Sequence, residues 1–592
     1  MSQYPKQSFS EIPLAQTVVK FCDIKRINHI VISPGSRNAP LNLGFTNNDN
    51  FITYSIVDER SAAFFALGLA QQLKHPVAVV CTSGSALLNY YPAVSEAFYS
   101  DIPLVVISAD RLPHRIDVGD GQTIRQPEVF EPHLEAAAYL TPDVSHASKT
   151  LLENPSQKLV AQDASESDLM HKQVEIQRSN EQKLDSVLNK AILNSGPVHI
   201  NVPLEEPLYG TTSKELIPQF ISDPEPNQTE INLDSYVTQW NSAAKKIILV
   251  GVLPPNSITD KILETWALDP SVIVLTEKTS NLKHSRFLDA IDSLIAPLEQ
   301  NGESAFEEIQ PDLLITLGGM VVSKKVKNFL RKFPPKKHWH INSKKAYNTY
   351  YVLSNHVKLD PQEFFDYLFS KPNTPIESSF NSAVHSIYSR NLLKGLAYLK
   401  TIPFSDLLAF KIIFNSIPKK LHLQLANSST IRYAQLFDLP KNVSVYCNRG
   451  TSGIDGSTST AVGAAYKTEL QTLLITGDLS FFYDCNALWN TYWKSNFRVI
   501  IINNQGGGIF RILPGKKDTP LYDKYYETVH NRNAKDLSKS FGLGYSSVYS
   551  GWRLKLKLKS FFKPSDRPQI LEIFTPRKIN DKVLLNYFKA MQ

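Results

Sequence analysis

Two neighbouring stretches, TLLITGDLS at residues 472–480 and RVIIINNQ at residues 498–505, decide the fold class of this chain. Each is a short apolar run that ends in polar residues, Asp478 in the first and Asn504 in the second. Runs of this kind are typical of parallel strands that are buried on both faces. About one β-α-β length separates the two strand ends, so the pair predicts a parallel sheet.

The same alternation extends over the whole chain. Strand-like runs occur at 28–33, 76–82, 102–108 and 196–209 in the first block, at 245–252, 271–277 and 312–319 in the second, and in LQLANSS, VSVYCNRG and QILEIF in the third. We therefore predict an α/β fold of three domains, each with a central, mostly parallel sheet flanked by helices. The predicted boundaries are 1–209, 210–378 and 379–592, and polar, Pro-containing residues 210–235 are interpreted as a linker.

Composition indicates an ordinary globular protein. The chain has 592 residues, of which 42% are hydrophobic and 20% are charged, so a folded core is expected. The formal net charge of +7 is weak evidence for nucleic-acid binding over this length, and an anionic small substrate explains it equally well. The four cysteines are widely spaced, which fits neither a C-x-x-C metal site nor a disulfide framework.

Three further segments bear on localisation and partners. Residues 1–10 lack a targeting pattern and no apolar run is long enough to span a bilayer, so we expect a cytoplasmic protein without a membrane partner. The alternation RLKLKLK at 553–559 could suggest a nucleic-acid binder, but it is interpreted as a strand with one solvated basic face. The charged, apolar-poor stretch 154–189 is interpreted as an exposed helical insertion.

The two strand ends carry oxygen ligands that suit a hard cation. Asp478, the side chain of Asn504 and the backbone carbonyl of Gly506 could hold a magnesium ion that tethers a diphosphate. Ser428 and Ser480 stand where helices should begin, and free backbone N–H groups there favour phosphate. The alternatives are two ordinary strand-end turns and two ordinary helix caps.

Glu59 stands at a predicted junction between a strand and an apolar helix, within IVDERSAAFFALGLA. An isolated glutamate at this position is commonly explained by the helix dipole alone. The combination of Glu59 with VCTSGSALLNYYPAVSEAF at 80–98, Asp478 and Asn504 resembles the thiamine-diphosphate enzyme superfamily. That resemblance implies that Glu59 contacts the aminopyrimidine ring and that the third domain holds the metal and the diphosphate.

Further motifs indicate one family within this superfamily. SPGSRNAPL at 33–41, SADRLP at 108–113, GQTIRQ at 121–126, CNRGTSGIDG at 447–456 and NNQGGGIFRILP at 503–514 are similar to those of the MenD family. The resemblance spans the first and third domains and is loose in the middle one. It implies a pyrimidine-binding first domain, a central spacer domain and a diphosphate-binding third domain.

The resemblance to the MenD family also implies an activity. It implies a transferase of menaquinone biosynthesis that decarboxylates 2-oxoglutarate and adds the remaining succinyl unit to isochorismate by 1,4-addition. The cofactors would be thiamine diphosphate and Mg²⁺, with Mn²⁺ as an alternative metal, and the assembly a homodimer or homotetramer. The rival within the superfamily is an acetolactate-synthase-like enzyme that handles small acyl groups.

The same resemblance assigns site residues. Glu59 and Gln122 would be catalytic, and apolar positions beside the cofactor would shield the reacting carbon from water. Arginine suits the dicarboxylate substrates because its planar fork donates two parallel hydrogen bonds. The cofactor-binding set is Glu59, Ser428, Gly453, Ile454, Ser480, Ile509 and Phe510, and the substrate-binding set is Ser36, Arg37, Arg111, Gln122, Lys324, Lys325, Arg432 and Arg449.

We expect Arg432 and Arg449 to bind the succinyl carboxylate, and Arg37 and Arg111 to bind isochorismate. The sequence departs from the family pattern at three places: Gly121 stands where Asn is frequent, Lys324 and Lys325 replace a Lys-Arg pair, and GDL replaces GDG. None of these changes removes a reactive group.

Overall fold

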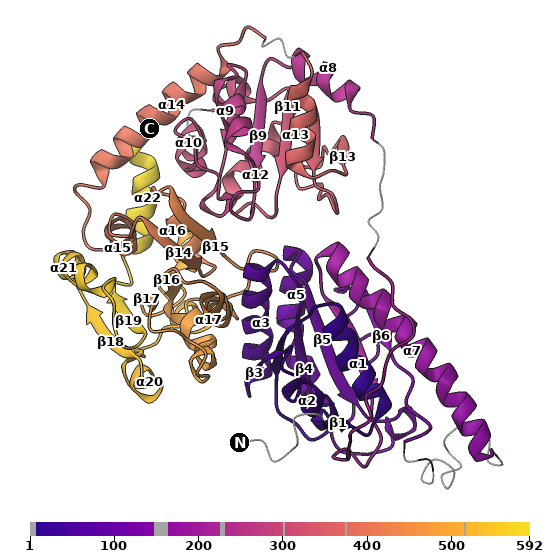
Figure 1. Cartoon of the computed structure of the whole chain (residues 1–592). Helices are drawn as coiled ribbons and strands as arrows, with labels where there is room; N and C mark the ends of the chain where they lie inside the picture. Colours follow the sequence, from indigo (N-terminus) through magenta and orange to yellow (C-terminus); the bar gives the residue numbers. More distant parts are fainter. Residues whose placement is uncertain are drawn as a thin grey trace. The chain divides into compact units, whose positions relative to one another are not determined.

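The computed structural model describes residues 8–146, 148, 164–224, 231–299, 302–372, 376–513, 515 and 517–592. The chain divides into two compact units. Unit 1 comprises residues 1–227, 458–469 and 484–493, and unit 2 comprises residues 228–457, 470–483 and 494–592. Each unit is an α/β structure built on parallel sheets, which confirms the predicted fold class (Figure 1).

Unit 1 contains a six-stranded sheet in the order β3-β2-β4-β5-β7-β6, in which all neighbouring strands run parallel. Its strands are β2 (His29–Ile32), β3 (Ile52–Ser55), β4 (Val77–Cys81), β5 (Leu104–Asp110), β6 (Ala136–Tyr139) and β7 (Val198–Pro203). A separate two-stranded antiparallel sheet pairs β1 (Phe9–Ser10) with β8 (Thr211–Thr212). Every residue of β4, β5 and β7 is buried, as expected for strands covered on both faces.

Helices cover both faces of this sheet (Figure 1). They are α1 (Pro13–Ile24), α2 (Ala39–Thr46), α3 (Glu59–Leu73), α4 (Ser85–Asn89), α5 (Tyr91–Ser100) and α7 (Glu166–Asn194). Two elements from later in the chain, α17 (Ser457–Lys467) and the 3-10 turn η3 (Cys485–Leu488), pack against α3. The side chain of Asp58 caps α3 by accepting a 3.1 Å hydrogen bond from the Ser61 N–H. Helices α3 and α17 pack closely, because a Cβ on Gly68 would lie 2.1 Å from the Thr460 carbonyl oxygen.

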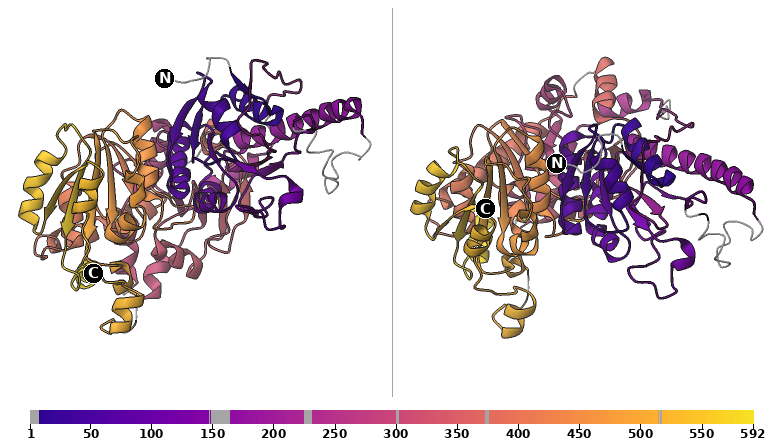
Figure 2. Two further views of the ribbon diagram at one scale, coloured as in Figure 1. Left: turned by 90° about the horizontal axis from the view of Figure 1, so that it is seen from below. Right: turned by 60° about the horizontal axis from the view of Figure 1, so that its bottom comes forward.

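Helix α7 confirms the predicted helix over part of the stretch 154–189 and corrects its description as an exposed insertion. Leu184, Val187 and Leu188 are buried in the core of unit 1, so the second half of α7 is a core helix. The first half carries the exposed side chains of Met170 and Val174 and extends beyond the sheet in both views of Figure 2. Residues 154–163 of the predicted segment lie outside the described residues.

Unit 2 contains two parallel sheets. The first has the order β10-β9-β11-β12-β13, and the second has the order β15-β14-β16-β17-β19-β18. The first sheet comprises β9 (Lys246–Val250), β10 (Val272–Leu275), β11 (Leu313–Leu317), β12 (Lys337–Ile341) and β13 (Asn355–Val357). The second comprises β14 (Lys420–Leu425), β15 (Asn442–Tyr446), β16 (Thr472–Gly477), β17 (Phe497–Asn503), β18 (Gly544–Val548) and β19 (Gln569–Phe574).

Helices surround the sheets of unit 2 (Figure 1). Around the first sheet lie α8 (Asp234–Ser242), α9 (Asp260–Leu268), α10 (Ile291–Leu298), α11 (Glu303–Ile309), α12 (Lys324–Lys332), α13 (Pro361–Ser370) and α14 (Phe380–Tyr398). The helices that belong to the second sheet are α15 (Asp406–Phe414), α16 (Ser429–Ala434), α18 (Asp478–Tyr483), α19 (Pro520–Tyr525), α20 (Lys535–Ser540), α21 (Gly551–Phe561) and α22 (Asn580–Ala590).

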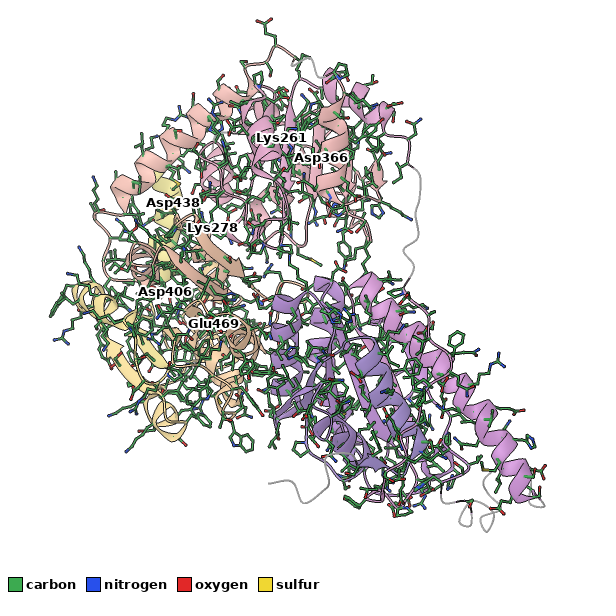
Figure 3. The ribbon with its side chains drawn as sticks, in the orientation of Figure 1. Lys261, Lys278, Asp366, Asp406, Asp438 and Glu469 are labelled. Atoms are coloured by element: carbon green, nitrogen blue, oxygen red, sulfur yellow. The ribbon has the colours of Figure 1, made fainter. Side chains whose placement is uncertain are left out.

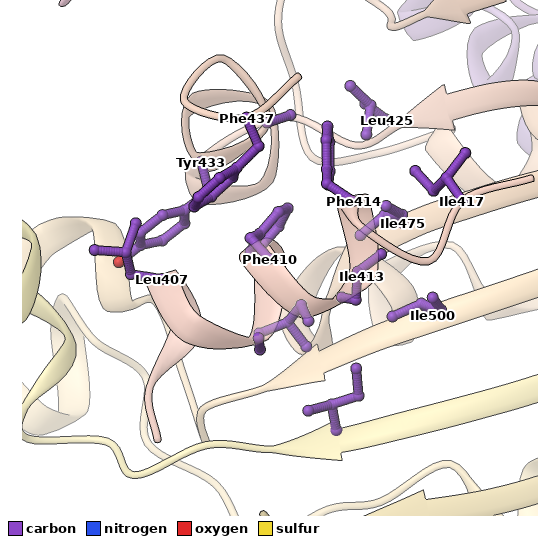
Figure 4. Packing of buried hydrophobic residues seen from close by; sticks show 14 of the residues in the cluster. Leu407, Phe410, Ile413, Phe414, Ile417, Leu425, Tyr433, Phe437, Ile475 and Ile500 are labelled. Atoms are coloured by element: carbon purple, nitrogen blue, oxygen red, sulfur yellow. The ribbon is translucent and has the colours of Figure 1, made fainter. Parts of the chain in front are cut away.

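Aromatic side chains pack α15 and α16 together beside the second sheet. The rings of Phe410 and Tyr433 are stacked with centroids 5.2 Å apart, and Phe414 and Phe437 lie next to them (Figure 4). Such pairs add to the free energy gained by burial of apolar surface. This packing holds α16 in place, and α16 begins at Ser429 within the segment 426–430.

The basic stretch 553–559 is a helix, so the predicted strand is wrong. It lies in α21, where Leu554 and Leu558 are buried one helical turn apart. Leu556 points outward and is exposed. The buried leucines are therefore four residues apart, which is the spacing of one face of a helix, although the letters also alternate as in a strand. Among the described residues, no helix is both long and apolar enough to cross a membrane.

Candidate active site

The predicted site residues fall into two groups, one in each unit. Unit 1 holds Ser36, Arg37, Glu59, Arg111 and Gln122. Unit 2 holds Lys324, Lys325, Ser428, Arg432, Arg449, Gly453, Ile454, Asp478, Ser480, Asn504, Gly506, Ile509 and Phe510.

Glu59 is the first residue of α3 and is half-buried. Its neighbourhood is fixed by Asp58, whose carboxylate accepts a 2.6 Å hydrogen bond from the Asn486 side chain. Burial raises the pKa of the Cys81 thiol, and the charge of Glu59 raises it further. Glu59 therefore lies near the end of β4, at the edge of the sheet where ligands bind in parallel α/β proteins.

Arg37 and Arg111 meet at the same edge of the sheet in unit 1. Arg37 is buried and donates hydrogen bonds to the Leu204 carbonyl (3.1 Å) and to Glu206 (2.9 Å). Burial lowers the pKa of Arg37, and the positive charge of Arg111 lowers it further. Two neighbouring cations of this kind favour an anion between them.

Arg111 also contacts the loop that carries Gln122. The Arg111 Nε donates a 3.1 Å hydrogen bond to the Gly121 carbonyl oxygen. Gln122 is exposed and has a left-handed backbone, with φ at 57°, and Ser36 is exposed as well. Both polar side chains are therefore accessible to a ligand.

In unit 2, Asp478 and Gly506 lie together at the carboxyl ends of β16 and β17. The Gly506 N–H donates a 3.0 Å hydrogen bond to Asp478 Oδ2, and Asp478 Oδ1 accepts a 2.7 Å bond from the Leu479 N–H. The ring nitrogen Nε2 of His530 lies 3.3 Å from Asp478 Oδ2. The Gly506 carbonyl accepts a hydrogen bond from the Gly508 N–H and keeps a second lone pair for another partner.

Asn504 fits the role of a cation ligand in its hydrogen bonding. Its Nδ2 donates a 2.9 Å hydrogen bond to Asp406, whereas its buried Oδ1 has no hydrogen-bond partner among the described residues. An orphaned buried oxygen is costly unless something else binds it. One carboxylate, one amide oxygen and one carbonyl make a donor set that Mg²⁺ accepts.

Asp406, which is labelled in Figure 3, is a buried carboxylate, and its hydrogen bond with Asn504 places it beside this donor set. Burial raises its pKa to about 6, the hydrogen bonds from Thr575 and Asn504 oppose the rise, and the charge of Asp478 adds to it. It was not predicted from the sequence, where an acidic residue after Ser405 at a helix start indicates only capping and the helix dipole.

The loops with the predicted diphosphate contacts converge around Asn427. Its Nδ2 donates 2.7 Å hydrogen bonds to the carbonyl oxygens of Asn448 and Gly453, and Ser480 Oγ donates a 2.7 Å bond to the Ile454 carbonyl. Ser428 precedes α16 with φ at 67° and makes no side-chain capping bond. Its hydroxyl is thus not used as an ordinary helix cap.

Ile509 and Phe510 lie on a 3-10 turn, Gly508–Ile512, which a buried glutamate holds in place. The Glu527 carbonyl accepts a 2.6 Å hydrogen bond from the Gly507 N–H, and its carboxylate pairs with Arg511 and Arg577. Phe510 itself is exposed.

A cavity of about 360 Å³ in unit 2 brings Lys324, Lys325 and Arg432 together with Ile509 and Phe510. Lys325 pairs with Glu299 at 2.5 Å, and Arg432 donates a 2.6 Å bond to the Ser428 carbonyl. Burial lowers the pKa of Arg432, and the charge of Arg449 lowers it further. The cavity therefore combines apolar walls with several cations, as an amphiphilic anion requires.

Arg449 stands close to this cavity and is only partly paired. It is 9% exposed, and its NH1 group donates a 2.7 Å hydrogen bond to Asn427. Its Nε has no hydrogen-bond partner among the described residues, so it retains a donor for a carboxylate.

Glu277 also lines the cavity and was not predicted from the sequence. Its carboxylate accepts hydrogen bonds from the backbone N–H groups of Val322 and Ser323, just before α12. Burial raises its pKa to about 7, and those two bonds and the charge of Arg449 oppose the rise. The available signal was its position after β10, at a strand end like that of Asp478.

Comparison with known proteins gives the class and the family. Residues 12–129 match the model of the thiamine pyrophosphate enzyme N-terminal TPP binding domain, and residues 427–573 match that of the C-terminal TPP binding domain. The fold and these matches define a thiamine-diphosphate-dependent enzyme.

Three relatives identify the family, and each is named 2-succinyl-5-enolpyruvyl-6-hydroxy-3-cyclohexene-1-carboxylate synthase. The chain is 52% identical to the one from Christiangramia forsetii and 49% identical to the one from Flavobacterium psychrophilum, each over 99% of this chain and 100% of the relative. It is 36% identical to the one from Porphyromonas gingivalis, over 96% of this chain and 95% of the relative. The chain belongs to this synthase family, the MenD family, which confirms the resemblance.

Proposed function

We propose that this protein is a 2-succinyl-5-enolpyruvyl-6-hydroxy-3-cyclohexene-1-carboxylate synthase. It decarboxylates 2-oxoglutarate and adds the succinyl unit to isochorismate, with release of CO₂, in menaquinone biosynthesis. The observation that carries the proposal is the identity of up to 52% over nearly the whole chain with synthases of that name. The cluster of Lys324, Lys325 and Arg432 in one cavity supports anionic substrates.

We propose that Asp478, the Oδ1 of Asn504 and the carbonyl of Gly506 bind Mg²⁺ or Mn²⁺. The unpaired, buried Oδ1 of Asn504 supports this role. The cation would link the protein to the diphosphate of the cofactor, while Ser428, Gly453 and Ser480 would line the diphosphate site.

Thiamine diphosphate, when bound, supplies a carbon nucleophile and accepts the electron pair that decarboxylation releases. Glu59 would share its carboxyl proton with a ring nitrogen of the aminopyrimidine. Ile454, Ile509 and Phe510 would exclude water from the reacting carbon. Gln122 and Ser36 would donate hydrogen bonds that orient the acceptor substrate.

The four arginines would divide between the two substrates. Arg432 and Arg449, which lie near each other in unit 2, would bind the distal carboxylate of 2-oxoglutarate. Arg37 and Arg111, near each other in unit 1, would bind isochorismate. Lys324 and Lys325 would supply further positive charge.

We also propose a homodimer, or a homotetramer built from dimers, in which Glu59 of one chain contacts the pyrimidine ring of a cofactor whose diphosphate is held by another chain. Cofactor would then favour association, because it binds the paired form better. Light scattering with and without thiamine diphosphate and Mg²⁺ tests this. A fully active monomer at assay concentration contradicts it.

A donor competition tests the choice of reaction. Purified protein with cofactor, Mg²⁺ and isochorismate receives equal amounts of 2-oxoglutarate and pyruvate, and the loss of each is followed. We expect consumption of 2-oxoglutarate alone, since pyruvate has no distal carboxylate for the arginines. Preferential consumption of pyruvate would favour an acetolactate-synthase-like enzyme instead.

A further inference from the structure

We infer that Asp406 is a positioning residue for the divalent cation, because it holds the Asn504 side chain in the one orientation that leaves its oxygen free for the metal. This inference rests on the proposed metal site. Asp406 does not itself touch the cation; it acts through Asn504, as outer partners of metal ligands commonly do.

The orientation of the Asn504 amide follows from its partner. A carboxylate only accepts hydrogen bonds, so the group of Asn504 that lies 2.9 Å from Asp406 Oδ2 is the amide nitrogen. The amide oxygen must then lie on the other side of the planar group. That oxygen is buried and has no hydrogen-bond partner among the described residues, which suits a ligand atom.

Asp406 is itself held from three directions. Its backbone N–H donates a 2.8 Å hydrogen bond to Asn580, and its Oδ1 accepts a 2.5 Å bond from the Thr575 hydroxyl. Ser405 caps the helix that Asp406 begins. With a fixed carboxylate, the amide of Asn504 loses the freedom to rotate and present its NH₂ group to the cation.

Asp406 forms hydrogen bonds with residues that follow two neighbouring strands of the sheet, β17 and β19. Thr575 directly follows β19 and Asn504 directly follows β17, and the Thr575 N–H donates a 3.1 Å bond to the Asn503 carbonyl. Asp406 bonds to the side chains beyond both strand ends. A carboxylate that served only the helix dipole would need neither contact.

The experiment measures Mn²⁺ affinity at a fixed concentration of thiamine diphosphate, from the electron paramagnetic resonance signal of free Mn²⁺. Asp406→Ala should raise the Mn²⁺ dissociation constant by about 10- to 100-fold, the usual effect of losing an outer partner. Asp406→Asn should raise it by about threefold or more, because a neutral amide is a weaker acceptor than a carboxylate. Circular dichroism and the melting temperature without metal report on folding separately.

Asp143→Asn is the matched control. Asp143 is also a buried carboxylate, and it accepts hydrogen bonds from a side-chain amide, that of Gln173, and from the Leu14 N–H. Asp143 belongs to unit 1, whereas the proposed metal ligands all belong to unit 2, so this variant should lose stability while keeping the Mn²⁺ affinity of the wild type.

Asp478→Ala separates the two proposals. If it loses Mn²⁺ while folded Asp406→Ala and Asp406→Asn keep the wild-type affinity, the positioning role is wrong and the metal site stands. If Asp478→Ala also keeps the wild-type affinity, the proposed metal site is wrong, and the positioning role falls with it. Should Asp406→Ala not fold, wild-type affinity in Asp406→Asn alone overturns the positioning role.

Discussion

The Gly506 N–H and the Asp478 carboxylate are joined by a 3.0 Å hydrogen bond across two loops that are 28 residues apart in the sequence. The bond ties the turn after β17 to the start of α18. It requires an unusual backbone at Gly506, where φ is 152° and an added Cβ would lie 2.5 Å from the Glu527 carbonyl oxygen. The geometry of the proposed metal site therefore depends on this glycine.

Replacement of Gly506 by alanine should weaken metal-dependent binding of the cofactor. Relief of the clash with Glu527 would move the carbonyl of residue 506 and would disturb the hydrogen bond that its N–H donates to Asp478, so we expect a loss of about tenfold or more in cofactor affinity. Calorimetry with and without Mg²⁺ measures it. Gly542→Ala is the control, because Gly542 also has positive φ but an added Cβ there meets nothing within 4 Å. Equal cofactor affinity in both variants would refute the prediction.

Glu59→Gln should fold and bind thiamine diphosphate but lose nearly all activity. A glutamine cannot share a carboxyl proton with the pyrimidine ring, and loss of a general acid–base group costs about 10²- to 10⁴-fold in rate. The measurement is kcat together with cofactor affinity on the same preparation. Near-normal turnover would show that Glu59 has no catalytic role.

Arg432→Ala should impair use of 2-oxoglutarate far more than binding of the cofactor. A buried substrate carboxylate that loses its charged partner costs about 2–5 kcal/mol, much of it from the stranded charge. The specificity constant for 2-oxoglutarate should therefore fall by about 30- to 4,000-fold, since each 1.4 kcal/mol is a factor of ten. Arg390→Ala, at an exposed position on α14, is the control and should have no effect. If saturation by isochorismate were impaired instead, the division of the arginines between substrates would be wrong.

Glu277→Gln should change the pH dependence of stability. Burial raises the pKa of Glu277 from its ordinary value of 4.5 to about 7, so between these values the folded protein holds a proton that the unfolded chain releases. The wild type therefore loses stability from this group as pH rises from about 4.5 to 7. Glutamine does not titrate, so the melting temperature of the variant relative to the wild type should rise between pH 5 and pH 8. A difference that is constant or falls over this range would contradict the prediction.

Much of the fold was predictable because parallel strands carry a strong signal. The apolar runs that end at Asp478 and Asn504 became β16 and β17, and their neighbours in the sheet followed from the same pattern. The alternation in 553–559 led to the wrong prediction of a strand. A helix that buries leucines at 554 and 558 shows the same alternating pattern as a strand when another leucine lies between them. Periodicity over seven residues does not separate the two structures.

The candidate site was predictable only where a side chain belongs to a motif. Arg37, Arg111 and Arg432 were selected in this way. In the structure Arg37 and Arg111 each donate a hydrogen bond to a polar neighbour, and Arg432 lines the cavity of unit 2. Asp406 and Glu277 could not be selected, because their partners come from distant parts of the chain. A carboxylate at a helix start or a strand end looks alike in the sequence whether it binds solvent, the helix or another side chain.

The most direct test of the proposed synthase activity is analysis of the complete reaction. Protein, thiamine diphosphate, Mg²⁺, 2-oxoglutarate and isochorismate are incubated together, and mass spectrometry follows the product while released CO₂ is quantified. We predict the 2-succinyl-5-enolpyruvyl-6-hydroxy-3-cyclohexene-1-carboxylate adduct, with one CO₂ released for each molecule formed. Cofactor-dependent consumption of 2-oxoglutarate without any adduct to isochorismate, or no consumption at all by folded protein, would contradict it.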